Sequence, residues 1–347
     1  MNKRSTIAAL ALAFAFTACS SRVSVPAVEV EPVESTRPLT IDDISAAAVN
    51  ADPTAATLRS TSGPVIVRAQ VLLDRAQFSV GVIDGNAGRN TELALVWFQK
   101  THNLPATSTL DSATYTRLMQ VAGAAPPVMR FVVDEETLQG PFIVLPRNVY
   151  EQARLRCLCY ASLTEKLAER FHATLEVMRK LNPGIGFAAL KPGDTIWVPA
   201  VEVLPSANPM RVARIQVAKK GSYVHAYDRS GRLVYHFPST LGSRYDPSPT
   251  GNFKVTGVAW DPVFRYDPTL FSDVADNKPG AKLPPGPNSP VGRVWIALSR
   301  DHIGIHGTPT PETIGFASSH GCVRLTNWDA TKLARAASRG TRVDFTS

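Results

Sequence analysis

Apolar residues recur at helical spacing in three runs between residues 64 and 122. Pro64 can occupy the first turn of a helix that reaches about residue 76. After an Asp-Gly turn signal, Asn90 or Thr91 can cap a second helix, and Asp111 can cap a third. The pattern therefore predicts a small all-α module of three helices over 64–122.

A mixed pattern follows over 130–200. Ser162 and Glu165 form a capping box before an amphipathic helix, and a shorter helix near 174–181 stops at an Asn-Pro-Gly sequence. A strand over 195–198 comes after a Pro-Gly-Asp turn, whereas an earlier strand is hard to place. We expect a small α+β module here.

From about residue 210, short apolar runs alternate with Gly and Pro turns. One amphipathic helix, from 327 or 328 to 337, interrupts this pattern before a last strand over 342–345. The segment 261–292 is too irregular for regular structure, and a long ordered loop of this kind is often a lid or substrate wall. We predict a mostly β domain over 210–347 in a multidomain chain.

The first residues have the features of an export signal. A basic start, an apolar run too short to span a bilayer comfortably and small residues at its end predict a signal peptide over 1–18. The sequence before Cys19 resembles a bacterial lipobox, although Phe16 stands where Leu is usual. We expect lipidation of Cys19, a flexible linker over 19–63, and a periplasmic location anchored to the outer membrane. Plain cleavage near Ala18, giving a soluble periplasmic protein, is the alternative.

Composition and charge narrow the classes of partner. Lysine and arginine exceed the acidic residues by 37 − 29 = 8. This mild excess suits an anionic cell envelope, but it is not clustered. No basic run contains interleaved aromatic residues, so we do not expect a nucleic-acid partner.

Candidate chemistry is concentrated in the last fifty residues. Cysteine is scarce, with four in 347 residues, and Cys322 sits between His320-Gly321 and Arg324. The thiolate is the nucleophilic form of cysteine, and a neighbouring imidazole, backbone N–H groups and an arginine would lower the pKa of the thiol. Cys322 is therefore the candidate nucleophile.

These residues resemble a known family. His306-Gly307, a spacer of eleven residues and the sequence from Ser319 to Arg324 look like the signature of the L,D-transpeptidase catalytic domain, over roughly 211–345. The resemblance implies a β-sandwich domain in an enzyme of cell wall biogenesis. Such enzymes act on peptidoglycan stem peptides through a cysteine thioester, and we expect no cofactor.

The resemblance also implies roles for single residues. Cys322 is the nucleophile and His306 the general base, ranked ahead of His320, which could instead orient the loop or line the oxyanion site. Backbone N–H groups around Gly321 and Cys322 would bind the oxyanion. Arg324 suits a carboxylate, either of the substrate or of a structural acid. The predicted substrate-binding residues are Gly307, Ser319 and Arg324.

The two N-terminal modules carry weaker resemblances. The module over 64–122 is similar to a three-helix peptidoglycan-binding domain, on residues that include Gln70, Asp84, Phe98 and Asp111. The module over 130–200 looks like a degenerate LysM module, which would bind glycan strands or serve only as a spacer.

Several alternatives stay open. The acyl acceptor can be a second stem peptide, giving a 3-3 cross-link, or an outer-membrane protein or lipoprotein. With water as acceptor the same site is an L,D-carboxypeptidase or a hydrolase of protein–peptidoglycan links. A non-catalytic lipoprotein that tethers peptidoglycan is a further possibility.

Two remaining features are a possible zinc site and the cysteine pair that the signature does not include. A site of His302, His306 and His320 would leave Cys322 idle and lacks an H-E-x-x-H pattern, so we predict no metal. Cys157 and Cys159 are interpreted as small, partly buried residues or as a disulfide without catalytic meaning.

Overall fold

The computed structural model describes residues 44–55, 57–201, 210–272 and 277–347. The predicted signal peptide over 1–18, the predicted lipidation site Cys19 and residues 20–43 of the predicted linker lie outside the described residues. Within the described ranges, no helix is both long enough and apolar enough to cross a membrane.

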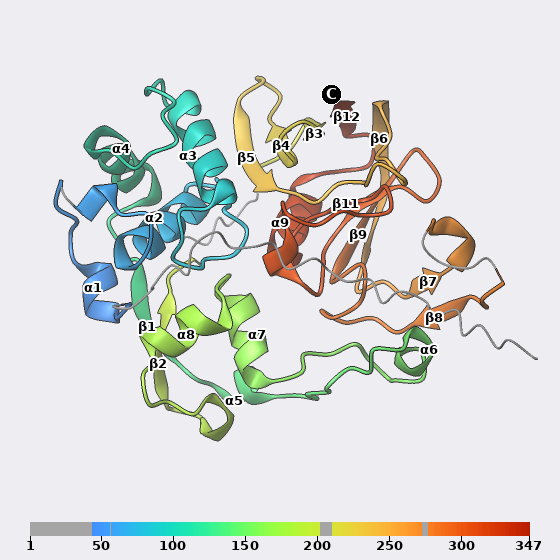
Figure 1. The fold of residues 1–347 in the computed structure, drawn as a ribbon, viewed down its shortest axis with the longest axis horizontal. Coiled ribbons are helices and arrows are strands. Elements are labelled where there is room, and N and C mark those ends of the chain that lie inside the picture. Colours follow the sequence, from blue (N-terminus) through green and yellow to red (C-terminus); the bar gives the residue numbers. More distant parts are fainter. Residues whose placement is uncertain (1–43, 56, 202–209, 273–276) are drawn as a thin grey trace, which may run out of the picture. The chain divides into compact units, whose positions relative to one another are not determined.

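The three helices predicted in the first module are present as α2 (Pro64–Arg75), α3 (Arg89–Thr101) and α4 (Ser112–Ala122) (Figure 1). Asp111 caps α4 as predicted, because its side chain accepts a hydrogen bond from Thr114 N. Helix α3 begins earlier than predicted, with Gly88 at its N-cap. The side chains of Asn90 and Thr91 are used elsewhere: the first donates to Ile314 O and the second accepts from Gln70.

The end of the segment predicted to be a flexible linker is structured. It forms α1 (Ala46–Asn50) and a 3-10 turn (Thr57–Arg59), and Val49 is fully buried. The amide of Asn50 makes two hydrogen bonds to the backbone of Val128, of 2.9 and 3.0 Å. This stretch is therefore part of the helical module's packing.

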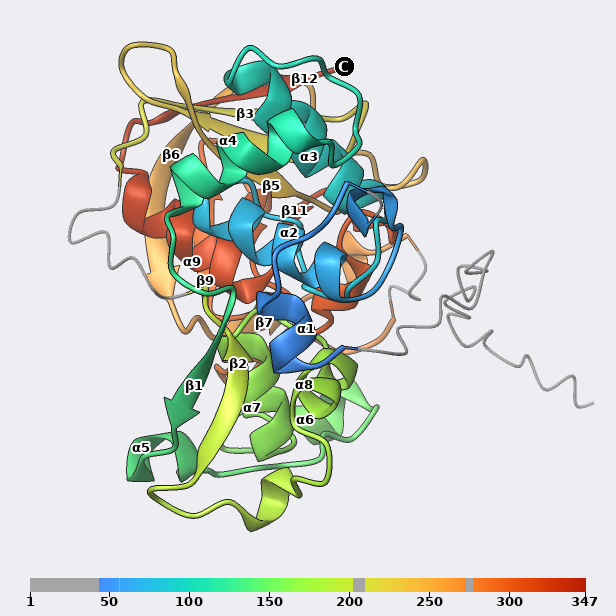
Figure 2. The ribbon, with the colours of Figure 1, turned by 90° about the vertical axis from the view of Figure 1, so that its left-hand side faces the viewer.

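The middle module consists of β1 (Val128–Val132), α7 (Leu163–Arg170), α8 (Leu175–Leu181) and β2 (Thr195–Pro199). The two strands pair antiparallel, and the helices pack beside them (Figure 2). The strand that was hard to place from sequence begins at Val128, ahead of the predicted boundary at 130. Val128 belongs to the same buried cluster as the apolar side chains of α2, α3 and α4, and Met129 and Phe131 pack against that cluster.

Between β1 and α7 the chain makes a long excursion. It contains the single-turn helices α5 (Glu135–Leu138) and α6 (Val149–Gln152) and a disulfide between Cys157 and Cys159. We call residues 139–161 the strap. Figure 1 shows it running from the middle module to a position beside strand β8. The disulfide is one of the two alternatives left open for these cysteines.

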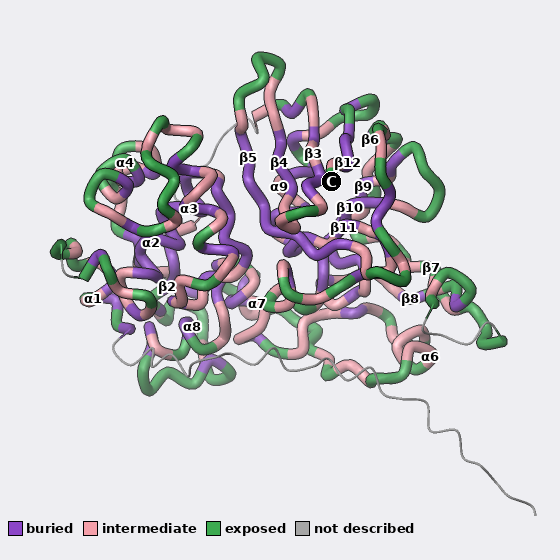
Figure 3. The backbone as a smooth tube through the Cα atoms, turned by 45° about the horizontal axis from the view of Figure 1, so that its top comes forward, coloured by how far each residue is buried: buried purple, intermediate pink, exposed green. Residues whose placement is uncertain are grey.

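The C-terminal domain is built on one sheet of eight strands in the order β11-β10-β9-β6-β12-β3-β4-β5. Its strands are β3 (Arg214–Ala218), β4 (Tyr223–Tyr227), β5 (Leu233–Pro238), β6 (Gly251–Trp260), β9 (Val294–Leu298), β10 (Gly304–His306), β11 (Val323–Arg324) and β12 (Arg342–Thr346). Figure 3 shows many buried positions along these strands, for example in β4, β5 and β10, whereas most of β6 is intermediate or exposed.

The expected β-sandwich is corrected to this single curled sheet. Strand β6 is ten residues long and pairs with β12 through its first half and with β9 through its second half. A register shift between Val255 and Gly257 separates the two halves. Because a bulge bends a strand and increases its twist, the sheet can fold around its own core without dividing in two.

The segment 261–292 is more regular than its sequence predicted. It contains a two-stranded antiparallel ribbon of β7 (Phe264–Tyr266) and β8 (Ala281–Leu283), with a 3-10 turn at Pro268–Leu270. The strands are only three residues long, which is too short for an alternating pattern to be recognised.

The helical module is joined to the large sheet at β5 and at α9 (Asn327–Ala336). Residues 77–79 lie along β5, where Ser79 N donates to His236 O and His236 N donates to Gln77 O, both at 3.0 Å. Ser79 Oγ also donates to Asp329 of α9 at 2.8 Å. These contacts, all between buried or nearly buried groups, hold α9 and the strands beneath it in place.

Candidate active site

Strands β10 and β11 bring the two halves of the sequence signature together. They are parallel neighbours, with Ile305 opposite Val323 and His306 opposite Arg324. Cys322 immediately precedes β11, so in this register it lies opposite Gly304, two positions along the strands from His306. Both residues line a cavity of about 660 Å³, and so do Ser319, His320 and Arg324.

His306 is buried and held in one tautomer. Its Nδ1 lies 2.7 Å from Gly307 O, and because a carbonyl only accepts, Nδ1 carries the proton. The ring also stacks on Trp295, with 5.3 Å between centroids and 18° between planes. Burial, together with the nearby charge of Arg324, lowers the pKa of His306 to about 3. The imidazole is therefore neutral at pH 7, with the Nε2 lone pair available to accept a proton.

The Cys322 side chain rests as a thiol. Its Sγ donates to His302 O at 3.3 Å. Burial raises the pKa of this thiol above its ordinary value, and the smaller opposing effects of the Gly304 backbone and of Arg324 do not reverse the shift. This differs from the expectation that neighbouring groups would lower the pKa, because desolvation of the thiolate outweighs them.

The loop that carries Cys322 is fixed through its backbone. Ser319 is buried, and its hydroxyl donates to Cys322 O at 2.6 Å while its N–H donates to Leu241 O at 2.8 Å. Ser248 Oγ donates to Gly321 O at 2.8 Å. Gly321 has a φ of 105°, a conformation that favours glycine. Ser319 thus supports the loop as well as lining the cavity.

Arg324 and His320 have different surroundings. The Arg324 guanidinium lies 3.5 Å from Ser318 O, and no carboxylate of the described residues lies within 4.0 Å of it. His320 packs edge-on against Phe271, with 4.8 Å between ring centroids, and its Nε2 is 3.9 Å from Asp246. Within the described ranges, no three His, Cys, Asp or Glu side chains converge as possible metal ligands.

Some residues at the site were not found from sequence. The Trp295 ring, which stacks on His306, packs closely over Gly304. A Cβ on Gly304 would lie 2.5 Å from this ring. The glycine between two isoleucines was the available signal for such a close approach. Val149 of the strap also lines the cavity, on the side of β7 and Phe271, and nothing in its local sequence indicated this.

Comparison with known proteins identifies the family of the domain that carries this cavity. Residues 213–344 match the family model of the L,D-transpeptidase catalytic domain. A protein of Bacillus licheniformis, "Putative L,D-transpeptidase YkuD", is 32% identical over 182 residues, which span 52% of this chain and 92% of the relative. The chain belongs to the L,D-transpeptidase family.

Other matches extend this result. "Putative L,D-transpeptidase YkuD" of Bacillus subtilis is 27% identical over 51% of this chain and 89% of its own length. "Probable L,D-transpeptidase YbiS" of Escherichia coli is 28% identical over 52% of this chain and 59% of its own length. Residues 62–118 match the family model "Putative peptidoglycan binding domain", in agreement with the resemblance seen in the helical module. The two family models leave residues 119–212 unmatched, and no match identifies the middle module of this L,D-transpeptidase as LysM.

Proposed function

We propose that this L,D-transpeptidase forms a thioester on Cys322 and uses neutral His306 as its general base. The observation that carries the proposal is the placement of both side chains on one cavity, with the proton of His306 fixed on Nδ1 by Gly307 O. A neutral imidazole and a thiol on the wall of one cavity suit base-assisted attack, in which the proton leaves sulfur as the bond to carbon forms.

In the first half-reaction, Cys322 Sγ attacks a carbonyl of the donor stem peptide while its proton moves to His306 Nε2. The resulting oxyanion needs hydrogen-bond donors, and the N–H groups of Gly321 and Cys322, which adjoin the sulfur in the sequence, are the candidates. The tetrahedral intermediate collapses to a thioester and expels the terminal D-amino acid. His306 returns the proton to that leaving amine.

Arg324 is the candidate for binding a substrate carboxylate. It lines the cavity and has no acidic partner among the described residues. A guanidinium matches a carboxylate with two parallel hydrogen bonds, so it would anchor a free carboxylate of the stem peptide. Ser319, Gly307 and His320 would act around it by shaping the loop and the cavity wall.

In the second half-reaction, an acceptor amine attacks the thioester and loses a proton to His306, and the sulfur recovers a proton as it leaves. An amine of a second stem peptide would give a 3-3 cross-link, and an amine of an outer-membrane protein or lipoprotein would attach that protein to peptidoglycan. The helical module would bind the sacculus, and we propose the same for the middle module, acting on glycan as a LysM-like unit. Lipidation of Cys19 would hold the enzyme at the outer membrane in the periplasm.

The test is intact mass after incubation with a tetrapeptide muropeptide, with and without an acceptor. Wild-type protein should gain a thioester adduct that converts to cross-linked product. Cys322→Ala should gain no adduct, and His306→Ala should lose more of the acylation rate than His320→Ala. An adduct that decays only to free tripeptide would indicate hydrolysis. Peptidoglycan binding with no adduct would leave a tether instead of an enzyme.

A further inference from the structure

Asn327 packs against Gly307, the residue that follows the proposed base His306. It is the first residue of α9 and is 2% exposed. Its Oδ1 accepts a hydrogen bond from Arg293 N at 3.1 Å, and its Nδ2 donates to Pro287 O at 3.0 Å. These two contacts leave one N–H of the amide to be satisfied.

The same amide is packed against Gly307. A Cβ on Gly307 would lie 2.1 Å from Asn327 Oδ1, so the amide occupies the space where any other residue would have a side chain. Gly307 O is the acceptor that fixes the proton of His306 Nδ1. A rotation of the Asn327 amide would therefore move the group that sets the tautomer of the base.

The remaining N–H of Asn327 donates to Glu169, a residue of the middle module. The distance from Nδ2 to Glu169 Oε2 is 2.9 Å, and Glu169 Oε1 accepts from the hydroxyl of Tyr160 at 2.7 Å. Both carboxylate oxygens are thus engaged. Burial raises the pKa of Glu169, against the lowering effect of these two hydrogen bonds. A half-buried Glu169 with this set of partners reinforces the orientation that Arg293 N and Pro287 O give the Asn327 amide, because a flipped amide would face Glu169 with an oxygen.

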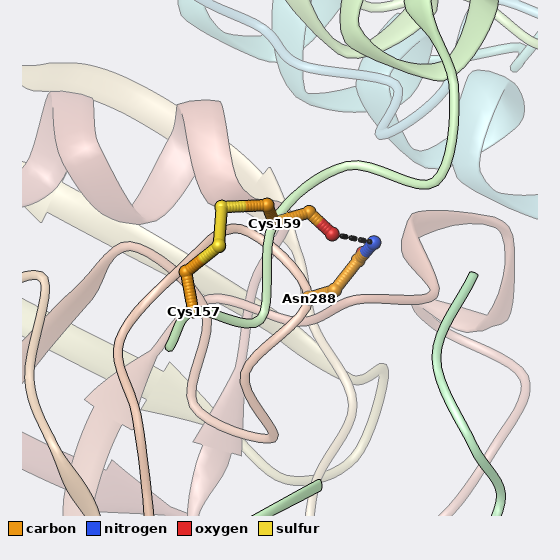
Figure 4. Close-up of a disulfide and its surroundings, with 3 residues drawn as sticks. All are labelled: Cys157, Cys159 and Asn288. Atoms are coloured by element: carbon orange, nitrogen blue, oxygen red, sulfur yellow. Dashed lines mark hydrogen bonds between the residues drawn. A yellow bond between two sulfur atoms is a disulfide. The ribbon is translucent and has the colours of Figure 1, made fainter. Parts of the chain in front are cut away.

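Further hydrogen bonds join the strap and α7 to residues 285–288. Leu158 N donates to Pro285 O and Asn288 N donates to Leu158 O, both at 2.9 Å. Asn288 Nδ2 donates to Cys159 O at 3.0 Å, beside the disulfide (Figure 4), and to Glu165 at 2.7 Å. The strap and α7 together therefore hold the segment that contains Pro287, the second acceptor for Asn327.

We propose that Glu169 is a positioning residue for His306, acting through Asn327 and Gly307. The inference rests on the proposed role of His306 as general base. Its consequence is that the middle module supplies part of the support of the active site, in addition to any glycan that it binds. Glu169 touches no substrate. It acts by keeping one amide orientation, and through it one tautomer of His306.

The test compares two substitutions of nearly equal volume. Glu169→Gln keeps an oxygen that can accept from Asn327, whereas Glu169→Met fills the site without an acceptor. Glu176→Met serves as the control, because Glu176 is an exposed residue of α8 in the same module, away from the cavity. The readouts are the rate constant of Cys322 acylation by a tetrapeptide stem, its KM, the melting temperature, and the 15N shifts of the His306 ring.

We expect Glu169→Met to lower the acylation rate constant about tenfold to a hundredfold, which is the scale for a misplaced catalytic group, with little change in KM. Glu169→Gln should restore the rate to within a few fold of wild type, and Glu176→Met should equal wild type. The 15N shifts should show the Nδ1-protonated tautomer in wild type and in Glu169→Gln, and a mixture of tautomers in Glu169→Met.

Two results would overturn the inference. In the first, Glu169→Met acylates at the wild-type rate with an unchanged His306 tautomer, whatever its melting temperature. In the second, Glu169→Gln and Glu169→Met acylate at equally reduced rates. The presence of an oxygen that accepts from Asn327 would then not explain the loss of rate. Failure of the proposed function looks different, because wild-type protein would then form no Cys322 adduct, or His306→Ala would acylate as fast as wild type.

Discussion

Alkylation of Cys322 as a function of pH tests whether the enzyme rests as a thiol beside a neutral imidazole. Burial raises the pKa of Cys322 above 9.0, the value for an unperturbed thiol, and lowers that of His306 to about 3. A thiol with a pKa of 9.0 is about 1% ionised at pH 7, so Cys322 should be ionised to a smaller extent.

The expected profile follows from these directions. Between pH 6 and 9 the rate of reaction with iodoacetamide should rise by about tenfold per pH unit, because the thiolate fraction rises in that proportion below the pKa. A preformed thiolate–imidazolium pair would instead react at nearly its full rate at pH 6. The assay is mass spectrometry of Cys322 in a Cys19→Ser background, with Cys157 and Cys159 left oxidised.

The control is His306→Ala. If Cys322 rests as a thiol, removal of a neutral imidazole should leave the pH profile of alkylation nearly unchanged, while acylation by the stem peptide is lost. A plateau of alkylation below pH 7 that disappears in His306→Ala would refute the assignment. It would show that the imidazolium form of His306 stabilises a thiolate in the free enzyme.

Three further predictions follow from other parts of the structure. Gly321→Ala should lower the acylation rate at least tenfold, because a φ of 105° costs about 1–3 kcal/mol for a residue with a Cβ. The control is Gly340→Ala, at a φ of 90° with open space around it, which should lower stability without changing the acylation rate. Asp329→Asn should raise the melting temperature more at pH 8 than at pH 5, since burial raises the pKa of Asp329 to about 6 and stability is lost as pH rises through that value; an equal effect at both pH values would contradict this. Deletion of residues 64–200 should abolish acylation of soluble stem peptides, because it removes the partners of β5, α9 and Asn327; wild-type acylation would contradict it.

Local sequence was sufficient to predict a helix or strand where that element contains its own capping, turn or periodicity signals. The N-cap at Asp111, the helix that begins after Thr174 and the strand β2 all lie where periodicity, capping residues and turn signals predicted them. Asn90 shows the limit of this reasoning. It is a good capping residue, but its amide donates to Ile314 in another module, so the helix begins without it.

The candidate site divides in the same way. The residues of the sequence signature could be placed on one cavity because the signature itself fixes their spacing. The pKa direction of Cys322 could not be predicted, because it depends on how deeply the thiol is buried. The role of Glu169 could not be predicted either, because its carboxylate acts through a hydrogen bond to the Asn327 amide, which is far away in the sequence.

The modules of this chain are less separate than their sequence boundaries indicate. The buried side chains of α2, α3 and α4 belong to one continuous cluster with those of β1, α7, α8 and β2, whereas the large sheet encloses a second cluster. The chain from 44 to 201 is therefore one packing unit. It meets the catalytic domain through a buried polar contact at Ser79 and a partly buried one at Glu169, and separating such groups would leave unsatisfied donors and acceptors in both parts. This assembly holds the helical module and Cys322 in a fixed relation, so if that module binds the sacculus as proposed, the part of peptidoglycan that it binds also limits which stem peptides can reach Cys322.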